Sequence, residues 1–193
     1  LKRLGVRPHE LAALILTHVH FDHCGCASYL QASGVPVIAS SVAAKFLQQG
    51  EQEGKSILKA GSKLPFIGRL LDEQARFPPV SADVLVESVL DLGDFGVEGE
   101  VRVSAGHTAG SVSVMLDKKQ ACVGDLMMGG YLGLPPAWQP NFHPLSSDNS
   151  EALSQIIAMR ESGTEKFCVG HGEVLLARDV DRWIDIQLKG KKR

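Results

Sequence analysis

The stretch Thr17-His18-Val19-His20-Phe21-Asp22-His23 places four side chains that can bind metal within six positions. It follows the apolar residues 14–16, which are typical of a buried strand. A single histidine beside an apolar run is usually structural, but packing does not explain three histidines interleaved with an aspartate. The stretch therefore predicts a metal site at the end of a strand.

Composition limits the class of protein. The chain has 193 residues, of which 44% are apolar and 22% are charged, and this fits one α/β domain over residues 1–193. A formal net charge of -2 gives no electrostatic footprint for nucleic acid, and no apolar run approaches the ~20 residues that span a bilayer. We therefore expect a cytoplasmic protein with no nucleic-acid or membrane partner.

The four cysteines do not have the spacing of a small disulfide scaffold, so we expect free thiols. Cys24 and Cys26 lie beside the histidine cluster. We interpret both as small buried residues of a helix and not as metal ligands.

Periodicity and turn signals predict alternating strands and helices. Residues 50–82 show a weak pattern, with a candidate helix at 67–75, and we interpret them as an excursion that forms either a lid or a surface loop. An irregular loop is predicted at 126–144. The predicted strands are 11–17, 35–39, 84–90, 97–105 and 167–169, with a hairpin of 112–116 and 121–123, and the predicted helices are 24–32, about 41–49, 148–162 and 180–188.

Three later segments repeat the plan of an apolar strand, a glycine or tight turn, and then a metal-binding side chain. They supply His107, Asp125 and His171. Pairing about the hairpin returns Asp125 to the sheet edge near His107. Five histidines and two aspartates exceed the needs of one four-coordinate ion and suit two ions that share a carboxylate. Such ligands suit zinc, but also iron or manganese.

These motifs together resemble the metallo-β-lactamase-fold hydrolase superfamily. His-x-His-x-Asp-His, Gly-His-Thr-x-Gly-Ser, a Gly-Asp after a hairpin and a late Gly-His-Gly occur here in the family's order, between about residues 11 and 176. The resemblance implies an αββα sandwich with two metal ions at one edge of its sheets. It assigns His18, His20 and His107 to the first metal, Asp22, His23 and His171 to the second, and Asp125 to the bridge between them.

The family normally has several strands before its first motif, and few residues precede it here. We therefore expect the N-terminal strands of the fold to be missing from this chain. Apolar faces that those strands would cover could then promote association, so a homo-oligomer is one expected state.

The resemblance implies a dinuclear metal-dependent hydrolase that uses a metal-bridging hydroxide on a small ester, thioester or lactone. Asp22 would also orient the nucleophile. Family members resembling β-lactamases generally lack the bridging aspartate, so the glyoxalase II and lactonase branch fits the ligands better. The alternatives are an RNase Z-like phosphodiesterase, a mononuclear iron oxidoreductase resembling persulfide dioxygenases, and an inactive metal-binding fragment.

The loop after Asp125 contains two candidate donors to a leaving group, Tyr131 and His143. We expect both to be ordinary packing residues of the loop. Substrate specificity should lie in residues 50–82 and 126–144, where no motif is readable.

Overall fold

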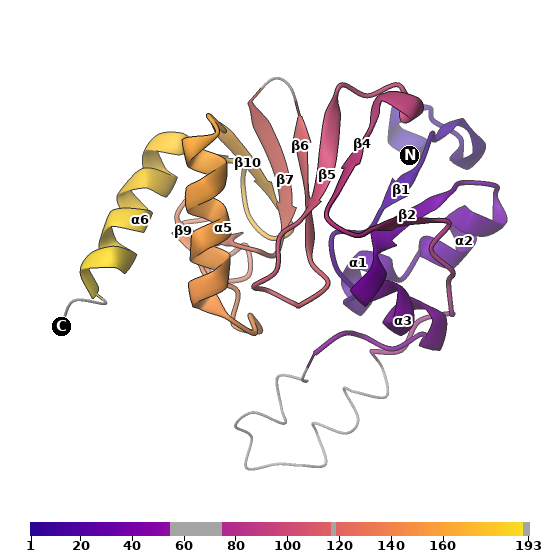
Figure 1. Cartoon of the computed structure of the whole chain (residues 1–193), viewed down its shortest axis with the longest axis horizontal. Helices are drawn as coiled ribbons and strands as arrows, with labels where there is room; N and C mark the ends of the chain where they lie inside the picture. Colours follow the sequence, from indigo (N-terminus) through magenta and orange to yellow (C-terminus); the bar gives the residue numbers. More distant parts are fainter. Residues whose placement is uncertain (55–74, 117–118, 191–193) are drawn as a thin grey trace, which may run out of the picture.

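Two sheets pack face to face between two layers of helices (Figure 1). The computed structural model describes residues 1–54, 75–116 and 119–190. One sheet, called sheet A, is parallel and consists of β1 (Leu14–Ile15), β2 (Val37–Ser40) and β3 (Val84–Val86). The other, sheet B, has the spatial order β11 (Leu175–Leu176), β10 (Lys166–Val169), β7 (Gln120–Gly124), β6 (Val112–Leu116), β5 (Gly99–Val103) and β4 (Val89–Asp91).

The helices divide between the two outer faces (Figure 1). On sheet A lie α1 (Phe21–Cys24), α2 (Ala27–Ala32) and α3 (Ser41–Gln49), and on sheet B lie α5 (Asn149–Glu161) and α6 (Ala177–Gly190). Short 3-10 turns occupy Lys2–Leu4, Pro8–Glu10 and Gly93–Phe95, and a small ribbon pairs β8 (Met128–Gly129) with β9 (Pro140–Asn141). The predicted αββα architecture is confirmed.

Alternation along the strands explains why the sheets are covered on both faces. In β2, Val37 and Ala39 pack against the helices of sheet A, while Ile38 between them enters the core between the sheets. Successive side chains of a strand point to opposite faces, so one apolar strand can contribute to two cores.

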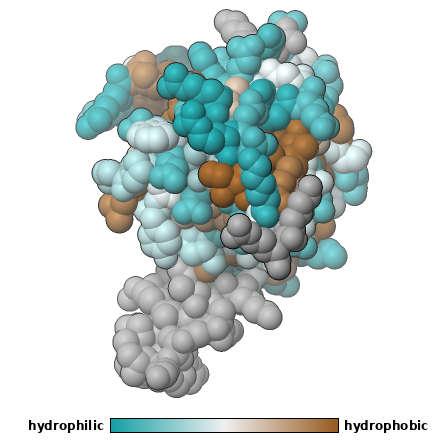
Figure 2. Space-filling model, turned by 90° about the vertical axis from the view of Figure 1, so that its left-hand side faces the viewer, coloured by the Kyte–Doolittle hydropathy of each residue, from teal (hydrophilic) through white to brown (hydrophobic). Residues whose placement is uncertain are grey.

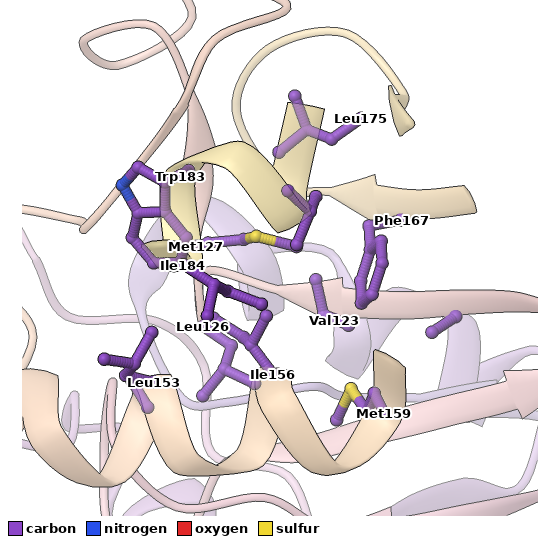
Figure 3. Close-up of a cluster of buried hydrophobic side chains, with 13 residues drawn as sticks. Val123, Leu126, Met127, Leu153, Ile156, Met159, Phe167, Leu175, Trp183 and Ile184 are labelled. Carbon is purple, nitrogen blue, oxygen red and sulfur yellow. The ribbon is translucent and has the colours of Figure 1, made fainter. Parts of the chain in front are cut away.

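Three apolar clusters correspond to the three interfaces of the sandwich. The middle cluster joins Ile38 and Val86 of sheet A to Val101, Val112 and Val114 of sheet B. The cluster between sheet B and its helices is drawn in Figure 3, where side chains from α5, α6 and β10 converge. These cores fix the two sheets relative to each other and so fix the edge where the strand ends meet.

Two helices, α3 and α5, begin with a side-chain cap. The Ser40 hydroxyl accepts a hydrogen bond from the backbone of Ala43, and the Asp148 carboxylate accepts from the backbones of Ser150 and Glu151. Such caps satisfy backbone N–H groups that have no partner inside the helix.

Several predicted boundaries are wrong. Residues 84–90 do not form one strand, because β3 belongs to sheet A and β4 to sheet B, and the chain crosses between the sheets in between. Only Leu14–Ile15 of the predicted strand 11–17 pairs in a ladder. The predicted helix 24–32 is broken between α1 and α2, and Cys26 at this break is exposed, whereas Cys24 is buried.

Other differences concern the ends of elements. The terminal helix begins at Ala177 instead of residue 180, and β11 precedes it without having been predicted. The loop 126–144 contains the β8–β9 ribbon. Most of the predicted helix 67–75 lies outside the described residues. The ends of the excursion meet at α3, where Gly50 O accepts from Phe77 N at 3.2 Å.

The terminal helix α6 is amphipathic. Val180, Trp183 and Ile184 are buried against sheet B, while Ile186 and Leu188 are exposed. Figure 2 views the molecule from the side on which α6 lies and shows a mainly hydrophilic face interrupted by a hydrophobic strip. Within the described residues, no helix has the length and apolarity that a bilayer crossing requires.

Candidate metal centre

The first group of candidate ligands follows shortly after β1. After the strand, Thr17 O accepts a hydrogen bond from Val112 N at 2.8 Å, which ties this segment to the start of β6 in sheet B. The chain then turns into α1, whose N-cap is His20. His23 N donates to His20 O at 3.0 Å, so one helical turn holds the second half of the motif beside the first.

His107 lies on the turn between β5 and β6. Its backbone carbonyl accepts from Ser147 N at 2.9 Å, and the carbonyl of Gly106 accepts from Asp148 N at 2.8 Å. Inside the turn, Ser111 Oγ accepts from Thr108 N at 3.0 Å. The turn is thus bound both to itself and to the start of α5, which restricts where the imidazole can lie.

Asp125 and His171 follow two paired strands of sheet B. β7 and β10 are parallel, with Cys122 opposite Cys168, and Gly170 N donates to Gly124 O at 2.8 Å beyond the ladder. Since parallel strands end at the same sheet edge, the residues that follow them become neighbours. The predicted convergence of these segments therefore has a direct basis in strand pairing.

All seven predicted ligand residues meet at this edge. The ligand atoms of His18, His20, His107 and Asp125 lie within 4.8 Å of one another, and so do those of Asp22, His23 and His171. The first group is buried, whereas Asp22 is exposed and His23 and His171 are partly buried. The second group is thus the side of the centre that solvent reaches.

Asp125 lies between the two groups. Its Oδ2 atom is 3.6 Å from His18 Nε2 and 3.8 Å from His107 Nε2 in the first group. The same oxygen is 3.4 Å from His23 Nε2 and 3.5 Å from His171 Nε2 in the second. One carboxylate oxygen therefore faces both sets of imidazoles.

The polar atoms at the centre suit a bound cation. Asp125 Oδ1 and His18 Nε2 are buried and have no hydrogen-bond partner among the described residues. Leaving such atoms buried without a partner is costly, and a divalent metal bound by imidazoles and carboxylates would satisfy them. The donor set and its spacing thus fit the metal ions that the sequence predicted.

The electrostatics favour the protonation states that bind metal. Burial, followed by the charge of His20, lowers the pKa of His107 to about 3, and burial also lowers the pKa values of His18 and His20. Burial by itself would raise the pKa of Asp125, but the contact with His23 and the charge of His18 hold that pKa below its usual range. Neutral His18, His20 and His107 beside an ionised Asp125 are ready to coordinate, whereas the pKa of His23 is raised.

The structure adds His143 to the centre. The residue is 6% exposed, and its Nε2 atom lies 3.6 Å from Asp125 Oδ2. The ring stacks on His171 at 5.7 Å and meets His107 edge-on at 4.8 Å. The expectation of ordinary loop packing is wrong for His143, because the β8–β9 ribbon returns the loop to the site. Tyr131, by contrast, is 58% exposed.

Sequence reasoning also missed Glu53, which lies behind the centre. The backbone carbonyl of Glu53 is 3.1 Å from His20 Nε2, and its carboxylate accepts from Gly110 N at 2.7 Å. Glu53 thus supports a ligand of the first motif and the turn that carries His107. No local signal marks it, since it lies in the weakly patterned stretch that follows α3.

An αββα sandwich with histidine and aspartate ligands at the ends of its strands defines a class of metal-binding proteins. A family model described as the metallo-beta-lactamase superfamily matches residues 1–171. The chain belongs to the metallo-beta-lactamase superfamily, whose members are largely metal-dependent hydrolases.

Solved structures with the same fold are distant in sequence. The protein TTHA1623 in a di-iron-bound form is 23% identical, with a TM-score of 0.62 over 94% of this chain and 78% of that one. The B3 metallo-beta-lactamase BLEG-1 is 22% identical, with a TM-score of 0.58 over 86% and 72%. The archaeal superfamily protein ST1585 from Sulfolobus tokodaii is 20% identical, with a TM-score of 0.56 over 90% and 66%. At these identities the likeness concerns the fold alone.

Proposed function

We propose that this protein is a hydrolase that binds two divalent metal ions and acts on a small ester, thioester or lactone. The observation that carries the proposal is the position of Asp125, whose buried Oδ2 atom faces both ligand groups at 3.4–3.8 Å. Two bound ions would lower the pKa of a shared water towards ~7 and polarise the carbonyl of a substrate.

The ligand residues divide between two positions. His18, His20 and His107 would hold one ion in the buried group, and Asp22, His23 and His171 would hold the other at the partly exposed group. Asp125 would bridge the two. Zinc suits these ligands, and iron is an alternative because TTHA1623 was solved in a di-iron-bound form.

The chain also provides an open side for a substrate. Asp22 and His171 are the accessible ligands, and Asp22 Oδ2 lies 3.4 Å from His171 Nε2. From this position the Asp22 carboxylate can both bind metal and orient a water for attack. The segment 131–134 passes close by, since a side chain added at Gly133 would contact the backbone of Gly172. Its exposed residues Tyr131, Leu132 and Leu134 suit a substrate with an apolar group.

The test compares the wild-type protein with Asp125→Ala. The wild type should bind about two metal ions per chain by elemental analysis and hydrolyse members of a panel of esters, thioesters and lactones. Asp125→Ala should lower metal content and activity together. The matched control is Asp181→Ala, a half-exposed carboxylate paired with Arg160 on the outer helices, which should change neither. Retention of both metal and activity in Asp125→Ala would refute the proposal.

A further inference from the structure

His143 is a sixth imidazole at a centre whose proposed ligands use five. It reaches the site from the segment after β9, and its Nε2 atom points towards Asp125 Oδ2 at 3.6 Å. Together with Asp125 and His171 it forms a third group whose ligand atoms lie within 4.8 Å of one another. Distance alone would therefore allow His143 to be a metal ligand. The hydrogen bonds of the ring show whether the nitrogen that faces the centre has a lone pair for a metal ion or carries a proton.

The partner of the outer ring nitrogen identifies which nitrogen carries the proton. A neutral imidazole has one N–H donor and one lone pair. In His20 the outer nitrogen, Nε2, is 3.1 Å from the carbonyl of Glu53, which can only accept. The proton of His20 is therefore on Nε2, and the lone pair of Nδ1 points into the centre, where it lies 3.1 Å from His107 Nε2.

In His143 the ring is turned the other way, so that Nε2 faces the centre and Nδ1 faces outwards. Its outer nitrogen, Nδ1, is 3.3 Å from Leu145 N, which is a backbone donor and cannot accept. The lone pair of His143 is therefore on Nδ1, and its proton is on Nε2, the nitrogen that faces Asp125. A nitrogen that carries a proton cannot bind a metal ion through a lone pair.

We propose that His143 is a catalytic hydrogen-bond donor whose Nε2–H binds the carbonyl oxygen of the substrate, and that it is not a metal ligand. This inference rests on the proposed hydrolysis of an ester, thioester or lactone. In that function Asp125 would be occupied in holding the metals, and the N–H of His143 would be free for an oxygen of the substrate. A buried donor that is already oriented stabilises the negative charge that develops on that oxygen during attack.

The first experiment measures the tautomer. Nitrogen-15 NMR of the zinc-loaded protein, with the His143 signals assigned by their loss in His143→Gln, should give a neutral ring with its proton on Nε2 and neither nitrogen bound to zinc. His20 should have the same Nε2–H tautomer, but with zinc bound to its Nδ1. A zinc-bound Nε2 in His143 would overturn the proposal.

Metal content provides a second readout that does not depend on turnover. His143→Phe keeps a ring of similar shape but has no N–H, and it should bind as much zinc as the wild type. The matched variant His171→Ala removes a proposed ligand and should bind less. Loss of zinc from His143→Phe and also from His143→Gln would make His143 a ligand and overturn the proposal.

Kinetics then test the role in catalysis. His143→Phe should lower kcat roughly 100-fold, the effect typical of losing one oriented oxyanion donor, while KM changes little. His143→Gln can place an amide N–H near the position of Nε2 and should restore much of the lost kcat. Equal losses in both variants, or none in His143→Phe, would contradict the proposal. If the wild type hydrolysed nothing in the panel, the proposed function would fail, whereas the NMR result would still decide the tautomer.

Discussion

Glu53 is one residue through which two separate segments hold their ligands in place. Glu53 is only 4% exposed; its carboxylate accepts from Gly110 N on the turn of His107, and its backbone carbonyl faces His20 Nε2. Groups that hydrogen-bond to metal ligands fix the orientation of those ligands and raise the affinity for metal.

Replacing Glu53 by alanine should therefore weaken both folding and metal binding. We expect a loss of about 1–3 kcal/mol in the free energy of unfolding, because Gly110 N–H would remain buried without its acceptor. Metal affinity should fall about 10–100-fold, as is typical when a supporting partner is lost. Urea unfolding and competition with a chelator would measure the two effects. Glu53→Gln keeps an oxygen that can accept from Gly110, so losses as large as those of Glu53→Ala would contradict this explanation.

The buried histidines should make the metal-free protein sensitive to acid. Burial lowers the pKa of folded His107 to about 3, whereas an unfolded histidine titrates near ~6.5. Below that pH the unfolded chain binds a proton that the folded chain does not, so stability is fully present above ~6.5 and falls as the pH is lowered towards 3. The expected slope from His107 is at most ~1.4 kcal/mol per pH unit.

Urea unfolding of the metal-free protein between pH 7.5 and 5 measures this slope. His18 and His20 add to it in the same direction because burial lowers their pKa values too, while the raised pKa of His23 opposes it. In His107→Gln the slope should be smaller. A stability that did not change over this range would show that the rings are already protonated in the folded metal-free state.

At the scale of elements, the residue after β10 lies against the centre. Gly170 N donates to Gly124 O, which ties the residues just before His171 and Asp125. A Cβ atom at Gly170 would overlap Asp125 Oδ1 and lie 2.7 Å from His23 Cε1. The glycine of the Gly-His-Gly motif therefore leaves the space that the carboxylate occupies.

Gly170→Ala should displace Asp125 and reduce the number of metal ions bound per chain. The cost should appear mainly in metal content, because the methyl group meets ligand side chains and not the apolar core. Elemental analysis and circular dichroism would separate loss of metal from loss of fold. The matched control is Gly190→Ala, where a Cβ has no atom within 4 Å. Full metal content in Gly170→Ala would contradict the close packing described here.

At the scale of the whole molecule, the centre joins the two halves of the sandwich. His18, His20, Asp22 and His23 follow β1 of sheet A, whereas His107, Asp125 and His171 follow β5, β7 and β10 of sheet B. Bound metal would therefore cross-link the sheets in addition to the apolar core between them.

Removing metal should lower the melting temperature strongly. At free metal a thousandfold above Kd, each site contributes ~4 kcal/mol to stability, and ~1 kcal/mol corresponds to about 2–4 °C in a chain of this size. A chelator should thus lower Tm by roughly 8–16 °C per site, measured by calorimetry. Asp125→Ala, with its bridge removed, should respond much less. An unchanged Tm in the wild type after verified metal loss would exclude the cross-link.

Most residues of the centre can be predicted from local sequence patterns. Apolar strands followed by His or Asp predicted seven of the eight residues that meet here, because a strand end on a rigid sheet carries its side chain to the sheet edge whatever the other strands do. The caps of α3 and α5 are equally local, since the hydrogen bonds to Ser40 and Asp148 span only two or three positions.

Tertiary structure decided which sheet each strand joins and which loop residues reach the centre. Residues 84–90 were divided between two sheets because pairing partners lay elsewhere in the chain, with Val84 beside Ile38 and Val89 beside Arg102. His143 reached the centre through the pairing of β8 with β9. The opening stretch, Thr17 to His23, thus predicted by itself a metal site and four of its candidate ligands. The packing of distant segments determined that Glu53 contacts His20 and Gly110 and that His143 lies beside Asp125. Those contacts depend on long-range packing that no local pattern encodes.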